Sequence, residues 1–242
     1  MSRSGIPLPD ADEAGNGFRS WARVTVIVAG FPLLLVHGFT QFQWVTEFYA
    51  GDRGLWRPFW TLALITEWSV MALVAATYLR PGRALEALGL PLRPSPRDLF
   101  AGGAVLFSFA ALALFGANGP QEFLARIPEG ARMFIPPSDL GSRLLWLAMC
   151  VTAAVVEETL WRAVLVRELT VRTRSVVVAT VAAAILFAYF HGGLRQGPAL
   201  FAWRATVALG FSWLYTATGN LRGPILIHFL IDAVALAAIQ VD

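Results

Sequence analysis

Long stretches without a charged residue most constrain what this chain can fold into. Four of them are residues 24–46, 99–121, 175–194 and 205–221. The hydrocarbon core of a bilayer is about 30 Å thick and needs roughly 20 apolar residues per helical span. Since 57% of the residues are hydrophobic and only 14% are charged, with a mean hydropathy of +0.60, the chain is too apolar for a soluble domain.

Three further segments are apolar but carry, or run into, ionisable side chains. They are residues 58–79 with Glu67, residues 144–156 followed by Glu157 and Glu158, and residues 223–241 with His228 and Asp232. We therefore predict an all-α fold, a polytopic transmembrane helical bundle of about seven spans, within a range of roughly six to eight.

The arginines indicate how the bundle sits in the membrane. Many of them fall near the N-terminus or in two connecting segments, and these are Arg3, Arg19, Arg23, Arg80, Arg83, Arg93, Arg97, Arg162, Arg167, Arg172 and Arg174. Cytoplasmic loops carry an excess of basic residues, so we predict a cytoplasmic N-terminus. A net charge of +3 placed in this way indicates membrane lipids rather than nucleic acid as the partner.

The single cysteine, Cys150, lies inside an apolar run. One cysteine can form neither a disulfide framework nor a cysteine metal site. We expect it to be a small, buried apolar residue.

Ionisable side chains inside a span are costly unless they face a partner or a wet cavity, so each is a candidate functional residue. Glu157 and Glu158 are adjacent and thus about 100° apart around a helix. Arg162 follows Glu158 by one helical turn. Glu158 and Arg162 can therefore pair on one face, which leaves Glu157 free to act as a general base.

Two later spans carry the remaining candidates. His191 follows a charge-free run, and His228 and Asp232 lie one turn apart on one face of the last span. Two carboxylates, two imidazoles and one further acid from three spans are the groups that a dry interior needs to activate water and stabilise an oxyanion. Each of them alone could instead be a buried polar side chain satisfied by a hydrogen bond.

Two other ionisable residues do not join this set. Glu67 lies in the middle of the second predicted span. We expect it to bond to a neighbouring hydroxyl or Trp, with a role in substrate or proton handling as the alternative. His37 lies near the far end of the first span, where a histidine at the level of the lipid headgroups is the better interpretation.

The spacing of the candidate residues is similar to that of a known family. The chain has EExxxR at Glu157, Glu158 and Arg162, FxxxH at Phe187 and His191, and HxxxD at His228 and Asp232. These residues resemble the three motifs of the CPBP family, the CAAX protease and bacteriocin-processing membrane enzymes. The resemblance covers roughly residues 143–242.

The resemblance implies a glutamic-type intramembrane endopeptidase that uses no metal or other cofactor. It implies that Glu157 and His191 position and activate water for attack on a peptide carbonyl. His228 and Asp232 would line the oxyanion side.

The same resemblance gives supporting roles to Glu158 and Arg162, and packs Phe187 beside the first catalytic histidine. Well-studied members have Asn where this chain has Asp232. An ionised carboxylate repels an oxyanion, so we expect Asp232 either to be protonated or to orient His228.

These interpretations divide the chain into three parts. Residues 1–20 are predicted to be a polar cytoplasmic leader, residues 21–142 the N-terminal transmembrane spans, and residues 143–242 a C-terminal catalytic transmembrane bundle of the CPBP type. The resemblance implies a multi-pass protein of a bacterial inner membrane, with a membrane-anchored or lipid-associated peptide or protein as substrate. It leaves open prenyl-protein processing, removal of sorting signals and bacteriocin immunity.

Two alternatives keep the same residues but change their function. Two histidines with two carboxylates could hold a zinc ion with an open coordination position, as in a zinc-dependent membrane protease. A non-catalytic membrane adaptor, immunity protein or transporter could use the same groups to relay protons or to bind a partner.

The candidate residues do not all lie at the same depth in the membrane if each span begins at its flanking arginine. Glu157 lies about 21 Å beyond Arg143, and His191 about 25 Å beyond Arg174 from the opposite side, at about 1.5 Å per residue. Straight helices with these ends do not bring the two together. We therefore expect shifted helix ends or bends, and the residues that favour bends are Gly192, Gly193, Pro198 and Pro224.

Overall fold

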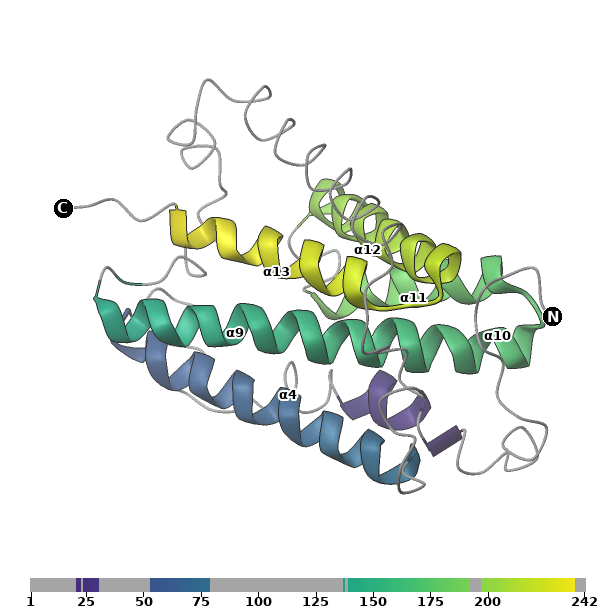
Figure 1. Ribbon diagram of the computed structural model, residues 1–242, viewed down its shortest axis with the longest axis horizontal. Coiled ribbons are helices and arrows are strands. Elements are labelled where there is room, and N and C mark those ends of the chain that lie inside the picture. The colour runs from purple at the N-terminus through teal and green to yellow at the C-terminus, as the bar shows by residue number, and fades with distance from the viewer. Residues whose placement is uncertain are drawn as a thin grey trace.

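The computed structural model describes residues 21–22, 24–30, 53–78, 137, 139–191 and 197–237. Within these residues all regular structure is helical, as predicted (Figure 1). Two helices, Trp56–Ala76 and Leu140–Thr173, are long and apolar enough to cross a membrane. The number of spans stays a prediction, because the predicted spans at 24–46 and 99–121 lie largely outside the described residues, as does His37.

The described helices fall in nine segments, and the connections from α9 to α11 and from α12 to α13 are short. In chain order they are η1 (Val26–Gly30), η3 (Arg53–Leu55), α4 (Trp56–Tyr78), α9 (Leu140–Glu158), the π-helical segment η4 (Thr159–Val166), α10 (Arg167–Thr173), α11 (Val176–Phe190), α12 (Pro198–Thr218) and α13 (Arg222–Ala237). No break separates α9, η4 and α10, which form one long rod (Figure 1).

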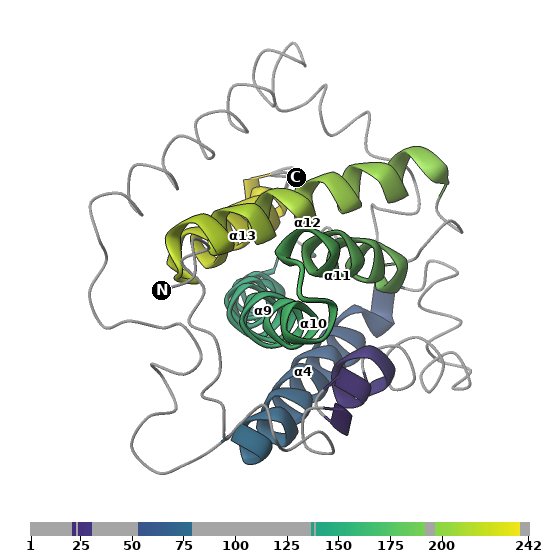
Figure 2. The same cartoon turned by 90° about the vertical axis from the view of Figure 1, so that its right-hand side faces the viewer.

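The rod is the centre of the bundle. Viewed along its axis, α4 lies on one side of it and α11, α12 and α13 lie on the other (Figure 2). The helix α4 runs parallel to α9, because Arg57 Nε donates to Ser142 Oγ at 3.0 Å near the start of both helices and Trp68 Nε1 donates to Thr152 Oγ1 at 3.1 Å further along.

The last helix, α13, runs antiparallel to the rod. Trp146 near the start of α9 donates from Nε1 to the Asp232 carbonyl oxygen at 3.2 Å. Glu158 at the end of α9 contacts His228 near the start of α13. The last helix therefore lays His228 and Asp232 along the rod.

The length of the rod brings Glu157 and His191 to the same level. From Glu157 to the end of the rod at Thr173 the chain rises about 24 Å, and from Val176 to His191 it returns about 22 Å. Straight antiparallel helices therefore suffice, and the expectation of shifted helix ends is confirmed. The span predicted to end soon after the glutamates in fact continues through a helix of 34 residues.

Neither Pro198 nor Pro224 bends a helix. Pro198 is the first residue of α12, and Pro224 lies in the first turn of α13, which continues to Ala237. Gly192 and Gly193 lie outside the described residues. The departure from α-helical geometry instead follows the two glutamates, in η4, and π-helical turns of this kind are frequent at functional sites.

A tight connection reverses the chain between α10 and α11. Arg174 adopts a left-handed conformation with φ of 54° and ends α10. Ser175 is the N-cap of α11, and its hydroxyl accepts a hydrogen bond from the Val178 amide at 3.3 Å. A left-handed C-terminal residue and a serine N-cap are the usual ways to end one helix and begin the next.

The helix α11 has the side-chain distribution of a membrane helix. Its small residues face the protein, and these are Ala179, Ala183, Ala184 and Ala188. Its exposed residues are large and apolar, namely Val177, Val178, Val181, Ile185 and Tyr189. Close packing through small residues, with bulky apolar residues facing outward, is what lipid as a solvent favours.

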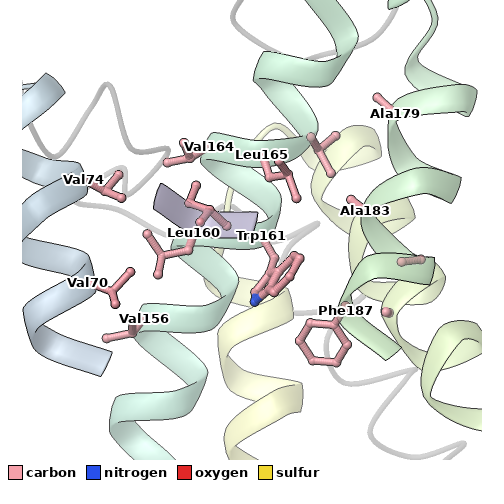
Figure 3. Close-up of a cluster of buried hydrophobic side chains, with 14 residues drawn as sticks. Val70, Val74, Val156, Leu160, Trp161, Val164, Leu165, Ala179, Ala183 and Phe187 are labelled. Carbon is pink, nitrogen blue, oxygen red and sulfur yellow. The ribbon is translucent and has the colours of Figure 1, made fainter. Parts of the chain in front are cut away.

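Apolar side chains fix the rod between α4 and α11. Val70 and Val74 of α4 pack on one side of it, and Ala179 and Ala183 of α11 on the other (Figure 3). The residues of the rod in this cluster are Val156, Leu160, Trp161, Val164, Leu165 and Val166. Because Glu157 and Glu158 lie within this tightly packed stretch of the rod, the scaffold around the two glutamates is rigid.

A second cluster joins the starts of α4 and α9. Trp56, Trp60 and Trp146 are buried against one another, with the Trp60 and Trp146 rings edge to face at 4.8 Å. Cys150 is buried in the same cluster and forms no disulfide, which confirms its predicted role as a small apolar residue. These aromatic contacts hold α4 and α9 in register.

Asp139 ties the beginning of α9 to α4. Its carboxylate accepts from the Ser142 amide at 2.9 Å and from the Ser142 hydroxyl at 2.7 Å, and it forms an ion pair with Arg57. The Ser142 hydrogen bonds, together with the Arg57 guanidinium, lower the pKa of Asp139 from 3.8 to about 2. The N-cap is therefore ionised throughout the physiological pH range.

We predict that Asp139→Ala lowers the thermal stability of the protein in detergent near neutral pH. The pKa of Asp139 is depressed in the folded state, so its contribution is present above about pH 4 and is lost as the pH falls toward about 2. The difference in Tm between wild type and variant, followed by Trp fluorescence, should narrow over that window. A difference that does not change with pH would contradict this assignment.

Candidate active site

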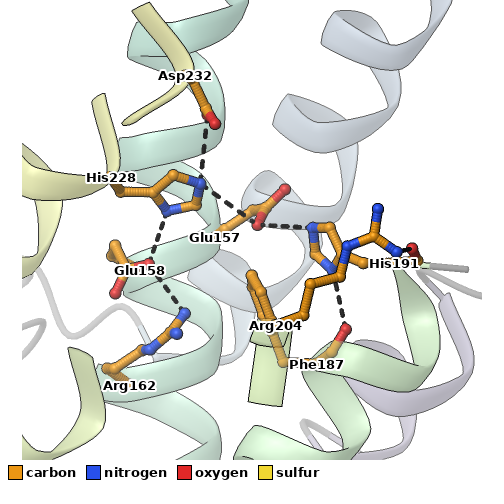
Figure 4. A network of polar contacts seen from close by, with 8 residues as sticks. All are labelled: Glu157, Glu158, Arg162, Phe187, His191, Arg204, His228 and Asp232. Carbon is orange, nitrogen blue, oxygen red and sulfur yellow. Dashed lines mark hydrogen bonds and ion pairs between the residues drawn. The ribbon is translucent and has the colours of Figure 1, made fainter. Parts of the chain in front are cut away.

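Glu158 is the most deeply buried of the candidate residues and is held by two partners. Arg162 Nη1 donates to Glu158 Oε1 at 2.9 Å, and the two side chains are 1% and 0% exposed. His228 Nδ1 lies 2.7 Å from the same oxygen (Figure 4). The predicted pairing of Glu158 with Arg162 is thus confirmed, and the sequence did not predict its bond to His228.

The other nitrogen of His228 faces two more carboxylates. Its Nε2 lies 3.3 Å from Asp232 Oδ2 and 3.9 Å from Glu157 Oε2. Since Nδ1 faces an ionised carboxylate held by Arg162, Nδ1 carries a proton. Asp232 lies one turn beyond His228, and its carboxylate fixes the direction in which Nε2 points.

Glu157 lies between the two imidazole rings. Its Oε2 is 3.4 Å from His191 Nε2 and 3.9 Å from His228 Nε2 (Figure 4). His191 Nδ1 lies 2.8 Å from the Phe187 carbonyl oxygen, which can only accept, so Nδ1 is a donor. In the neutral ring, Nε2 then has a lone pair that faces Glu157, and a proton or a water is needed between them.

Aromatic rings form the walls of the site. Phe187 stacks on His191 with ring centroids 4.0 Å apart, and Phe211 stacks on His228 at 5.6 Å. The Arg162 guanidinium carbon lies 4.7 Å from the Phe187 centroid and 5.2 Å from the Phe211 centroid. Rings in these positions exclude water and favour a positive charge on the groups that they face.

Phe211 was not predicted from the sequence. It lies on α12, in a run of apolar residues with no polar motif to single it out. Its position becomes evident only when α12 and α13 are packed together.

Arg204 is a second residue that sequence reasoning missed. Its guanidinium donates from Nη1 to the His191 carbonyl oxygen, at the C-terminal end of α11. In the sequence, Arg204 directly precedes the charge-free run 205–221. In the structure it lies inside α12, which begins at Pro198. An arginine inside a membrane-length helix was the available signal.

The site is open on one side. The side chains of Glu157 and His228 are each 9% exposed, whereas His191 is 35% exposed and Asp232 is 31% exposed. A substrate and water can therefore reach the buried carboxylate past His191 and Asp232.

The described residues also bear on the zinc alternative. Among them, no three His, Cys, Asp or Glu side chains are arranged to hold one metal ion. Both histidines face the Glu157 carboxylate through Nε2, and the other nitrogen of His228 is engaged by Glu158.

We predict that Arg162→Met destabilises the protein by roughly 3–5 kcal/mol, because it leaves the buried carboxylate of Glu158 without its cation. The double variant Glu158→Gln with Arg162→Met should recover part of this loss, since both charges are then absent. Denaturant unfolding in mixed micelles measures the free energy of unfolding of Arg162→Met, of Glu158→Gln and of the double variant. If the losses in the two single variants add up to the loss in the double variant, Glu158 and Arg162 are not coupled.

Comparison with known proteins gives one family. Residues 139–234 match the sequence model described as type II CAAX prenyl endopeptidase Rce1-like. No curated protein matches the chain, and no solved structure does. All seven motif residues, from Glu157 to Asp232, lie inside the matched segment. Residues 139–234 are therefore similar to the Rce1-like type II CAAX prenyl endopeptidases, a family of glutamic-type intramembrane proteases.

Proposed function

We propose that the chain hydrolyses a peptide bond of a membrane-associated protein or peptide, with a water molecule activated by Glu157 and His191. The observation that carries the proposal is the position of the Glu157 carboxylate between two imidazole Nε2 atoms, at 3.4 Å and 3.9 Å, in an otherwise apolar interior. A buried carboxylate with adjacent imidazoles is a general base with a place to pass its proton.

The proposed first step is attack of water on the substrate carbonyl. Glu157 takes one proton from the water while the water oxygen bonds to the carbonyl carbon. His191 Nε2, 3.4 Å from Glu157 Oε2, then receives this proton, because its own Nδ1 proton is engaged by the Phe187 carbonyl. When the C–N bond breaks, the proton passes to the leaving amine, so that water and peptide give one acid and one amine.

His228 is the proposed donor to the oxyanion. Both of its nitrogens face carboxylates, and only a doubly protonated ring donates at both. The Nε2 proton, directed between Asp232 and Glu157, is then available to the developing negative charge. This arrangement supports the role of Asp232 as the residue that orients His228 rather than as a donor to the oxyanion.

The membrane position of the site supports a membrane-anchored substrate. If α4 and α9 both cross the bilayer in parallel, residues 79–138 must contain an odd number of crossings, and the predicted span at 99–121 would supply one. With a cytoplasmic N-terminus in a bacterial inner membrane, the arginine-rich end of the rod would face the cytoplasm. The name of the matched family refers to prenylated CAAX proteins, and for this chain we propose the broader class of lipid-anchored or membrane-spanning peptides.

We predict that Glu157→Gln lowers the rate of cleavage by roughly 10²–10⁴-fold, the usual contribution of a general base. Quantitative proteomics of membranes from cells with this variant should then show specific uncut precursors. Glu168→Gln is the matched control, because it changes the same functional group further along the same rod, on α10.

Accumulation of precursors in the Glu157→Gln cells alone would name the substrates. Equal membrane proteomes in wild-type and Glu157→Gln cells, at equal protein levels, would contradict the protease and favour a non-catalytic adaptor or transporter.

We predict that Asp232→Asn keeps most of the activity, because the amide oxygen still accepts from His228 Nε2. Asp232→Leu should lower kcat by roughly 10- to 100-fold, the equivalent of one hydrogen bond to a charged group. The comparison uses the precursor found in the Glu157→Gln cells. Equal losses in both variants would show that the negative charge, and not the orientation of His228, is what matters.

A further inference from the structure

Glu67 is a buried acid on the face of α4 that packs against the rod. The buried residues of α4 recur at alternating intervals of four and three, at Trp56, Trp60, Ala63, Glu67, Val70 and Val74, with Thr66 beside them. Glu67 is the one acid in this set. It is 4% exposed, and a carboxyl in such a position is costly relative to an apolar residue.

Packing does not explain this acid, because one of its two carboxyl oxygens is buried without a partner among the described residues. Trp68 donates to Thr152, and the Thr66 hydroxyl donates to the Leu62 carbonyl of its own helix. Within the described part of the chain, Glu67 Oε2 is buried without a hydrogen-bond partner. The expected bond to a neighbouring Trp or hydroxyl is therefore not met at this oxygen.

The register of α4 and α9 brings Glu67 close to the active site. Trp68, the next residue, contacts Thr152, and Glu157 follows Thr152 by about 8 Å along the helix axis. This is an offset along the helix axis, and it is short enough for one or two water molecules to connect the two side chains.

The charges that act on Glu67 are those of the site. They belong to Glu157, His228 and Asp232. Two other described elements pack against α4: η1 (Val26–Gly30) has no titratable group, and η3 (Arg53–Leu55) lies about 20 Å along the helix from Glu67. No arginine of the described residues acts on Glu67 in the way that Arg162 does on Glu158.

We propose that Glu67 is a positioning residue that exchanges a proton with Glu157 through bridging water, so that α4 completes a site that the matched family segment alone does not contain. Two carboxyls whose charges act on each other in an apolar interior share one proton. During hydrolysis the pair gains one proton from the attacking water and passes one through His191 to the leaving amine, so it ends as it began. This inference rests on the proposed protease function.

Three variants of Glu67 separate proton exchange from packing. Glu67→Gln keeps the shape of the side chain but cannot exchange a proton. Glu67→Leu places an apolar side chain among the apolar residues of α4, and Glu67→Asp retains the carboxyl group. Thr66→Val is the control, because it changes a buried polar residue on the same turn whose hydroxyl bonds only to its own helix.

The assay uses full-length protein in detergent and the precursor that accumulates in the Glu157→Gln cells. Glu67→Gln and Glu67→Leu should each lower kcat by roughly 10- to 100-fold with KM unchanged. In both variants the kcat–pH profile should lose one ionisation, the one that the carboxyl of Glu67 contributes in the wild type. Glu67→Asp should restore part of the rate, and Glu67→Leu should have a Tm at least equal to that of wild type.

Wild-type kcat and pH profile in Glu67→Gln would overturn the inference, as would a loss of rate matched by a loss of Tm. The outcome for Glu157→Gln separates the two proposals. If Glu157→Gln is inactive while Glu67→Gln is fully active, only the inference on Glu67 fails. If Glu157→Gln cleaves like wild type and no precursor accumulates, the proposed function fails and the inference fails with it.

Discussion

The helical bundle depends on one buried carboxylate, Glu158, and on the two cationic side chains that bond to it. Glu158 is fully buried, and removing it from water is tolerable because Arg162 and His228 both bond to one of its oxygens. Breaking such a buried pair costs far more than forming it gains. The bond between Glu158 and His228 therefore holds α13 against the rod, and it fixes the histidine that faces Glu157.

A single long helix supplies the geometry. Because the rod continues to Thr173 and α11 returns over the same length, His191 arrives beside Glu157 without a kink. Arg204 then caps the end of α11, and the Phe187 and Phe211 rings stack on the two imidazoles. Phe187 lies on α11, Arg204 and Phe211 on α12 and His228 on α13, so the site exists only when the bundle is assembled.

Contacts within one helix could be predicted from the sequence, whereas contacts between helices could not. The pairs Glu158 with Arg162 and His228 with Asp232 follow from the 3.6-residue period alone. The bond from His228 to Glu158 depends on the antiparallel packing of α13, which no spacing reveals. The expectation of bends had the same origin, because Arg162, Arg167, Arg172 and Arg174 were assigned to a connecting segment between two spans. In fact the helix continues, and its buried polar face is covered by protein.

The most direct test of this account is the environment of the imidazoles. The chain has three histidines, so ¹⁵N-histidine labelling of the protein in micelles gives few side-chain signals, and His191→Gln and His228→Gln variants assign the two at the site. The account predicts that Glu158→Gln shifts the signals of His228 and leaves those of His191 unchanged, while Glu157→Gln shifts both. If Glu157→Gln leaves both rings unchanged, the carboxylate does not lie between them and the proposed site is wrong.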